Sequence, residues 1–312
     1  MDLDPAFDPS RPFTRAQGLR AGLTGWDMRS RRFVRLQRNV YVATGADVTL
    51  PKRATAALLV APRGAIVSHF TAAELWGGAV PSSSSVWVTI RRSQAFTGAG
   101  VRVHQSDRVR ETTRRFGLTL TSPEQTFIDL ARHLDLVQLV VLGDRLVRRE
   151  VTTTDRLMRA ASQWSGHHQQ LVCAAAAHVR AGVDSPPESR LRMLIVMGGL
   201  PEPAVNYAIR DEDTGDILRR FELAYVKHRL AIEYEGQFHR GDPDVWARDI
   251  NRREDLDRRA WRVVQVIAPG LHQSPHVTLA RVERARVDCG AKPTPLLSEE
   301  WKRYFPGRSD AS

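Results

Sequence analysis

Three glutamates lie in two short apolar segments in the last third of the chain. Glu222 lies within residues 219–225, and Glu233 and Glu235 lie within residues 230–235. Both segments carry the apolar residues typical of buried strands, and the four residues between them are enough for a hairpin turn. Carboxylates gathered on one face of a sheet can hold a divalent cation, so this region is the first candidate for chemistry.

The expected register of the hairpin brings the three carboxylates together. If the turn centres between Lys227 and His228, Glu222 lies opposite Glu233, at a side-chain separation of roughly 5 Å. Glu235 shares a face with Glu233 because side chains alternate along a strand. Such like charges are destabilising unless one proton is shared, arginines neutralise them or a cation lies between them. Oxygen ligands favour Mg²⁺ or Mn²⁺ over zinc; the alternative is an exposed acidic strand edge without metal.

The composition indicates a globular protein with an anionic partner. A chain of 312 residues favours two or three domains, and its 42% hydrophobic and 26% charged residues are ordinary. The net charge of +11 and the pI near 10.5 favour nucleic acid as that partner, with simple solubility as the alternative. Apolar runs stay short of a membrane span, the first residues are acidic, and Cys173 and Cys289 lie far apart, so we expect a cytoplasmic protein without membrane contact.

The N-terminal segment has the outline of a small winged helix-turn-helix. Thr14 has capping-box spacing and starts a helix over 15–21, a second short helix is expected over 26–32, and a hairpin over 33–42. Eight arginines and one acid lie between positions 11 and 38, which suits contacts with DNA phosphates; the alternative is a solvated basic face. The arginines expected to contact DNA are Arg29, Arg31, Arg32, Arg35 and Arg38.

The middle region mixes helices and strands and shows no catalytic spacing. His167 and His168 are adjacent on an expected loop and are not assigned to a metal site. Helices are predicted over 53–60, 68–77, 137–149 and 154–164 and from the cap at Ser122, and strands over 85–91 and 101–104.

A set of short motifs in the last third of the chain points to one family in combination. These are Glu188, Gly199-Leu200-Pro201, Phe221-Glu222-Leu223-Ala224, Leu230 to Gly236, His239, Asp249, Arg252, Leu256 and Trp261-Arg262-Val263-Val264. With them the sequence resembles, over about a quarter of its length, the Vsr-like (very short patch repair-type) endonuclease domain of the PD-(D/E)xK nuclease superfamily.

This resemblance implies roles for five side chains. Glu222 takes the place of the motif's aspartate as a metal ligand, Glu233 is the second ligand, and Glu235 stands where lysine is common. Glu188 is implied to bind the metal or to orient a metal-bound water, and His239 to act as a general acid or base. The implied reaction is hydrolysis of DNA phosphodiester bonds with Mg²⁺ or Mn²⁺.

Three of these positions have other readings. Glu188 lies three residues after Ser185, so helix capping alone can explain it. His239 could instead contact phosphate or solvent. Arg252 is a candidate contact to DNA, or it forms a surface ion pair with a neighbouring aspartate such as Asp249.

The region from Phe13 to Leu130 resembles the AbiEi-type antitoxin proteins, which carry an N-terminal winged helix. The matching pieces are Thr14-Arg15-Ala16-Gln17, Gly22-Leu23, Val40-Tyr41, Ser68-His69, Thr71-Ala72-Ala73, Thr121-Ser122-Pro123, Thr126 and Asp129-Leu130. The two resemblances together imply a DNA-binding module fused to a nuclease-like module.

We therefore expect a mixed α/β (α+β) chain that ends in a restriction-endonuclease-like domain with a central mixed sheet. Its expected function is metal-dependent DNA cleavage in repair, restriction or phage defence. The alternative is a DNA-binding regulator of toxin–antitoxin type with an inactive nuclease fold, acting with a partner protein encoded nearby; the sequence leaves the oligomeric state open. The expected boundaries are a tail at 1–12, the winged helix at 13–48, the middle region at 49–180, the nuclease-like domain at 181–290 and a tail at 291–312.

Overall fold

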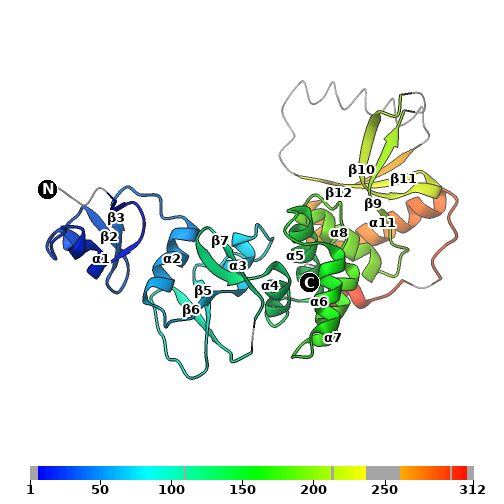
Figure 1. The fold of residues 1–312 in the computed structure, drawn as a ribbon. Coiled ribbons are helices and arrows are strands. Elements are labelled where there is room, and N and C mark those ends of the chain that lie inside the picture. The colour runs from blue at the N-terminus through cyan, green and yellow to red at the C-terminus, as the bar shows by residue number, and fades with distance from the viewer. Residues whose placement is uncertain (1–5, 109, 212–213, 237–260, 296, 308–312) are drawn as a thin grey trace, which may run out of the picture. The chain divides into compact units, whose positions relative to one another are not determined.

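The computed structural model describes residues 6–108, 110–211, 214–236, 261–295 and 297–307 (Figure 1). The chain forms two compact units: unit 1 holds residues 1–133 and 155–173, and unit 2 holds residues 134–154 and 174–312. Helices and three β-sheets are present, so the expected mixed α/β class is confirmed. Within the described ranges, no helix has the length and apolar character needed to cross a membrane.

Unit 1 begins with a small three-stranded sheet in the order β1-β3-β2. Thr14 starts its first helix through a complete capping box with Gln17, as expected. The second helix, expected over 26–32, is a single 3-10 turn, because Ser30 returns to extended backbone directly after it. The core of this module packs Phe13, Leu23, Met28 and Tyr41 together. The elements are β1 (Phe13–Thr14), α1 (Arg15–Arg20), η1 (Asp27–Arg29), β2 (Phe33–Gln37) and β3 (Val40–Ala43).

The rest of unit 1 is a five-stranded sheet in the order β6-β5-β4-β8-β7. The sequence predicted β5 and β6, but it indicated neither β7 nor β8, whose strands are four residues each. Trp76 on the sheet's helical cover donates its indole N–H to the carbonyl of Thr121 at 3.0 Å. The elements are α2 (Leu50–Val60), β4 (Ile66–Val67), α3 (His69–Leu75), β5 (Val86–Ile90), β6 (Val101–Gln105), β7 (Thr112–Arg115), β8 (Leu118–Thr121), α4 (Pro123–Leu130) and α6 (Thr154–Gln163).

Unit 2 is built on a four-stranded sheet in the order β12-β11-β10-β9. Strands β9, β10 and β11 are antiparallel neighbours, and β12 runs parallel to β11. Helices α8 and α11 pack against this sheet (Figure 1). The elements are α5 (Leu136–Arg148), α7 (Gln169–His178), which continues from unit 1, α8 (Pro186–Met197), β9 (Ala204–Arg210), β10 (Ile217–Tyr225), η2 (Val226–His228), β11 (Leu230–Glu235), β12 (Arg262–Ile267), α10 (Ala268–His272), α11 (Pro275–Asp288) and η4 (Glu300–Arg303).

The hairpin between β10 and β11 has the predicted register. Leu223 pairs with Ile232, and the pairing ends there, so Glu222 and Glu233 lie just beyond the last paired positions. The turn is η2, and it ends at Arg229, which adopts the left-handed backbone conformation that reverses the chain.

The units divide the chain differently from the expected boundaries. Residues 134–154 belong to unit 2 because the Asp144 carboxylate of α5 binds Arg192 of α8 at 3.0 Å. Arg192 is fully buried and also binds the carbonyl of His178 at 2.7 Å. Within the segment expected as a C-terminal tail, Phe305 is only 3% exposed.

Candidate active site

Glu222 is the centre of the carboxylate cluster in unit 2. Its carboxylate accepts a hydrogen bond of 2.6 Å from the backbone N–H of Tyr234 on the neighbouring strand. Burial raises the pKa of Glu222 to about 7, against the lowering effect of that hydrogen bond, and the nearby charges of Glu188, Glu233 and Asp184 raise it further. Near neutral pH this carboxyl is therefore divided between its protonated and ionised forms.

Glu188 enters the cluster from the first turn of α8. Ser185 caps this helix by accepting the backbone N–H of Glu188 at 3.4 Å. The Glu188 carboxylate accepts the N–H of Asp184 at 3.1 Å, so it takes part in the helix start. It is also only 6% exposed, and burial raises its pKa. Capping explains where the side chain lies, while its charge acts on Glu222.

Glu233 is held by an arginine that the sequence analysis did not single out. Both oxygens of its carboxylate accept from one nitrogen of Arg219, at 3.0 and 3.1 Å. Arg219 lies on β10, and its guanidinium also stands 4.9 Å from the centroid of the Phe221 ring. The other terminal nitrogen of Arg219 is buried without a hydrogen-bond partner in the described part of the chain. Arg219 therefore neutralises the charge of Glu233 and retains one buried N–H donor group without a partner among the described residues.

Of the other residues that the sequence predicted for the site, Glu235 lies within the described residues, and His239 and Arg252 lie outside them. Glu235 is partly exposed at the end of β11. Lys227, the lysine nearest to Glu235 in the sequence, lies in the turn at the opposite end of the hairpin, about 20 Å from Glu235 at the rise of a strand. Arg219 is the basic group beside the carboxylates instead.

The donor set of the cluster fits a hard divalent cation. It consists of carboxylate oxygens, and the pKa of Glu222 is raised first by burial and then by the neighbouring carboxylates. Glu222 and Glu188 would hold such an ion, and Glu233 would join them by leaving Arg219. In the described ranges, no three His, Cys, Asp or Glu side chains already stand in metal-binding geometry, so binding would require these side chains to turn.

The arginines expected to contact DNA are exposed on the N-terminal module. Arg32 forms an ion pair, because its guanidinium lies 3.3 Å from the buried carboxylate of Asp27. Three basic side chains, Arg15, Arg35 and Arg38, line a groove of about 990 Å³ on this side of unit 1. The structure thus gathers part of the predicted set around one concave surface, which suits a phosphate backbone.

Two proteins with similar sequences come from Mycobacterium tuberculosis. The uncharacterized protein Rv2248 of strain ATCC 25618 / H37Rv is 26% identical over 254 residues, which cover 80% of this chain and 91% of that protein. The uncharacterized protein MT2308 of strain CDC 1551 / Oshkosh matches with the same values. No protein-family model matches the chain.

Proposed function

We propose that the chain is a cytoplasmic DNA endonuclease that depends on Mg²⁺ or Mn²⁺ and acts in restriction, phage defence or repair. The observation that carries this proposal is the partly buried carboxyl of Glu222, which lies beside Glu188 and Glu233 on the central strands of the sheet and has a raised pKa. A structural carboxylate would gain stability from a nearby arginine, whereas in this cluster Arg219 binds Glu233 alone. A bound cation would favour the ionised form of Glu222.

In this proposal, Glu222, Glu188 and Arg219 have different roles in hydrolysis of the phosphodiester bond. When bound, a divalent cation supplies positive charge to the phosphate and lowers the pKa of a water molecule. Glu222 and Glu188 would bind the cation through their carboxylate oxygens. The hydrogen bond from the backbone N–H of Tyr234 fixes the orientation of the Glu222 carboxylate. Arg219 has an unused buried N–H that can donate to a phosphate oxygen, the role that lysine fills in the related motif.

Cleavage of DNA in the presence of metal tests this proposal. The purified chain should nick plasmid DNA with Mg²⁺ or Mn²⁺, and Glu233→Ala should lower the rate by at least about 100-fold while leaving DNA binding intact. Glu299→Ala is the matched control, because Glu299 is exposed and bonded only to its helical neighbour Lys302. A wild-type chain that binds DNA but never cuts duplex, mismatched or single-stranded substrates with either metal would refute the endonuclease.

A second candidate is a DNA-binding regulator with an inactive nuclease fold, as in antitoxin proteins. One observation favours it: Glu233, an expected metal ligand, already has a two-oxygen ion pair with Arg219. For this function we expect DNA binding that depends on salt concentration and no metal-stimulated cleavage in the nicking assay. Isothermal titration with Mn²⁺ should then give no heat of binding.

A further inference from the structure

We propose that unit 1 holds a pocket for a phosphorylated nucleoside, which is a function beyond DNA cleavage and independent of it. The pocket lies where β6, the end of α4 and the segment after α6 meet, and it encloses about 800 Å³. This volume falls within the roughly 300–1,000 Å³ range of small-molecule sites and exceeds what a phosphate ion alone requires.

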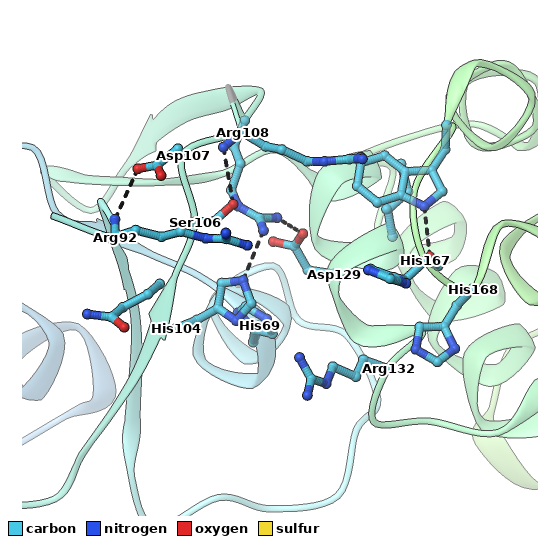
Figure 2. A pocket seen from close by; sticks show the side chains of 14 residues that line it. His69, Arg92, His104, Ser106, Asp107, Arg108, Asp129, Arg132, His167 and His168 are labelled. Carbon is cyan, nitrogen blue, oxygen red and sulfur yellow. Dashed lines mark hydrogen bonds and ion pairs between the residues drawn. The ribbon is translucent and has the colours of Figure 1, made fainter.

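The charge of the pocket is positive. Four arginines and two aspartates line it. Within the described residues, the guanidinium groups of Arg92, Arg108 and Arg132 have no hydrogen-bond or ion-pair partner. Arg108 stands over the Trp164 ring, so Arg92 and Arg132 are the two with neither contact. Figure 2 shows both side chains at the same cavity as His104, His167 and His168. Guanidinium groups bind phosphate through paired N–H donors, so two unpaired arginines at one cavity favour a phosphate group.

A buried ion pair at the base of the pocket is incompletely satisfied. Arg110 pairs with Asp129, and their side chains are only 9% and 2% exposed. His104 lies 3.2 Å from Arg110, and Gln125 donates to Asp129 at 2.8 Å. Even so, Nε of Arg110 and Oδ2 of Asp129 have no hydrogen-bond partner in the described part of the chain. A buried polar group without a hydrogen-bond partner destabilises the folded chain. A phosphate oxygen would accept from the former, and a ribose hydroxyl would donate to the latter.

Two histidines of the pocket, His69 and His104, stay neutral beside these arginines. Burial lowers the pKa of His69 to about 2 and that of His104 to about 4, and the charge of Arg110 lowers both further. His69 instead shares a hydrogen bond of 2.9 Å with the hydroxyl of Ser68. The imidazoles of His69 and His104 therefore offer neutral hydrogen-bonding groups and flat faces, while the arginines supply positive charge to the pocket.

Flat side chains form the opposite wall. Trp164 lies there with His167 and His168, and its indole N–H donates to the carbonyl of His167 at 3.0 Å. Arg108 stands over the Trp164 ring at 4.8 Å from the centroid. Aromatic and guanidinium faces stack with nucleobases, with an affinity that tolerates any base. A phosphate at the arginines and a base at this wall together describe a nucleotide.

Isothermal titration of the full chain with AMP tests the pocket. We expect a dissociation constant in the micromolar range, with adenosine and inorganic phosphate each at least tenfold weaker. Arg132→Ala and Arg92→Ala should each weaken AMP binding by tenfold or more. Arg114→Ala is the matched control, because Arg114 is exposed on β7 at the other edge of the same sheet, and it should leave the affinity unchanged.

The outcomes separate the pocket from the endonuclease. Glu222→Gln should bind AMP like the wild type, whatever its effect on DNA cleavage. A 5′-phosphorylated oligonucleotide that displaces AMP would identify a strand end as the natural ligand, and failure to displace it would identify the free nucleotide. If AMP, GMP, CMP and UMP all fail to bind, or if Arg114→Ala weakens binding as much as Arg132→Ala, the pocket proposal is wrong. Should Arg132→Ala not fold, Arg92→Gln replaces it.

Discussion

The two units concentrate charge of opposite sign, and they relieve it in different ways. In unit 2, the carboxylates of Glu188, Glu222 and Glu233 gather with one arginine among them, and the pKa of Glu222 rises to about 7. In unit 1, arginines gather with the buried Asp129 among them, and the pKa of His104 falls to about 4. A carboxylate can take up a proton, but a guanidinium cannot release one. The basic pocket can therefore be neutralised only by an anion.

The largest effect should come from removing the single buried counter-charge of the basic pocket. Asp129→Asn leaves Arg110 buried without an ionised partner, and we expect a loss of about 3–5 kcal/mol in the free energy of unfolding of unit 1. Urea denaturation monitored by tryptophan fluorescence measures it. Asp107→Asn is the matched control, because this exposed carboxylate accepts only the backbone N–H of Arg92, and it should cost less than about 1 kcal/mol. Equal losses in the two variants would show that Arg110 does not depend on its partner.

The acidic cluster should respond to loss of its arginine in the opposite sense. Arg219→Gln frees the Glu233 carboxylate from its ion pair, so we expect the affinity for Mn²⁺ to rise by about tenfold, or about 1.4 kcal/mol, while DNA cleavage falls. Isothermal titration gives the affinity, and a plasmid nicking assay gives the rate. If Mn²⁺ binds more weakly to Arg219→Gln than to wild type, Glu233 is not in competition between arginine and metal.

The smallest effect concerns pH. The pKa of Glu222 is about 7 in the folded state against 4.5 as its ordinary value, so ionisation destabilises the folded chain as pH rises from 4.5 through 7. Glu222→Gln removes this loss and keeps an acceptor for Tyr234. We expect the variant to match the wild type at pH 4 and to exceed it by about 1 kcal/mol at pH 8, after screening of a partly exposed group.

Thermal or urea denaturation across this pH range checks the sign of the effect. Glu299→Gln should show no such trend, since Glu299 is exposed. A Glu222→Gln chain that is less stable than wild type at pH 8 would mean that the ionised carboxylate is favoured by a partner other than a cation.

Local patterns in the sequence predicted the hairpin of unit 2 well. Alternation along β10 and β11 and the four-residue turn predicted the register in which Leu223 pairs with Ile232. The same local signals predicted the caps at Thr14 and Ser185. The pairing of Arg219 with Glu233 could not be anticipated from alternation, because Arg219 lies three residues before Glu222 and is expected on the opposite face of the strand.

The pocket of unit 1 could not be predicted in the same way. Its side chains come from five segments between His69 and His168, and no spacing in the chain relates them. His167 and His168 were interpreted as incidental loop residues, and only the tertiary fold brings them to the same cavity as His69. The strands β7 and β8 were missed as well, because four-residue strands carry too few alternations to be recognised.

The buried contact between Asp144 and Arg192 has a consequence for how this protein can be divided. Residues 134–154 contribute to unit 2, residues 155–173 return to unit 1, and the chain then enters unit 2 again. A gene fragment starting at residue 181 would encode Arg192 with Glu202 but without its buried partner Asp144. A fragment ending at residue 180 would separate α5 from α8, the helix that it contacts. Each unit is thus built from two separate stretches of chain, so no single cut in the gene yields either unit whole.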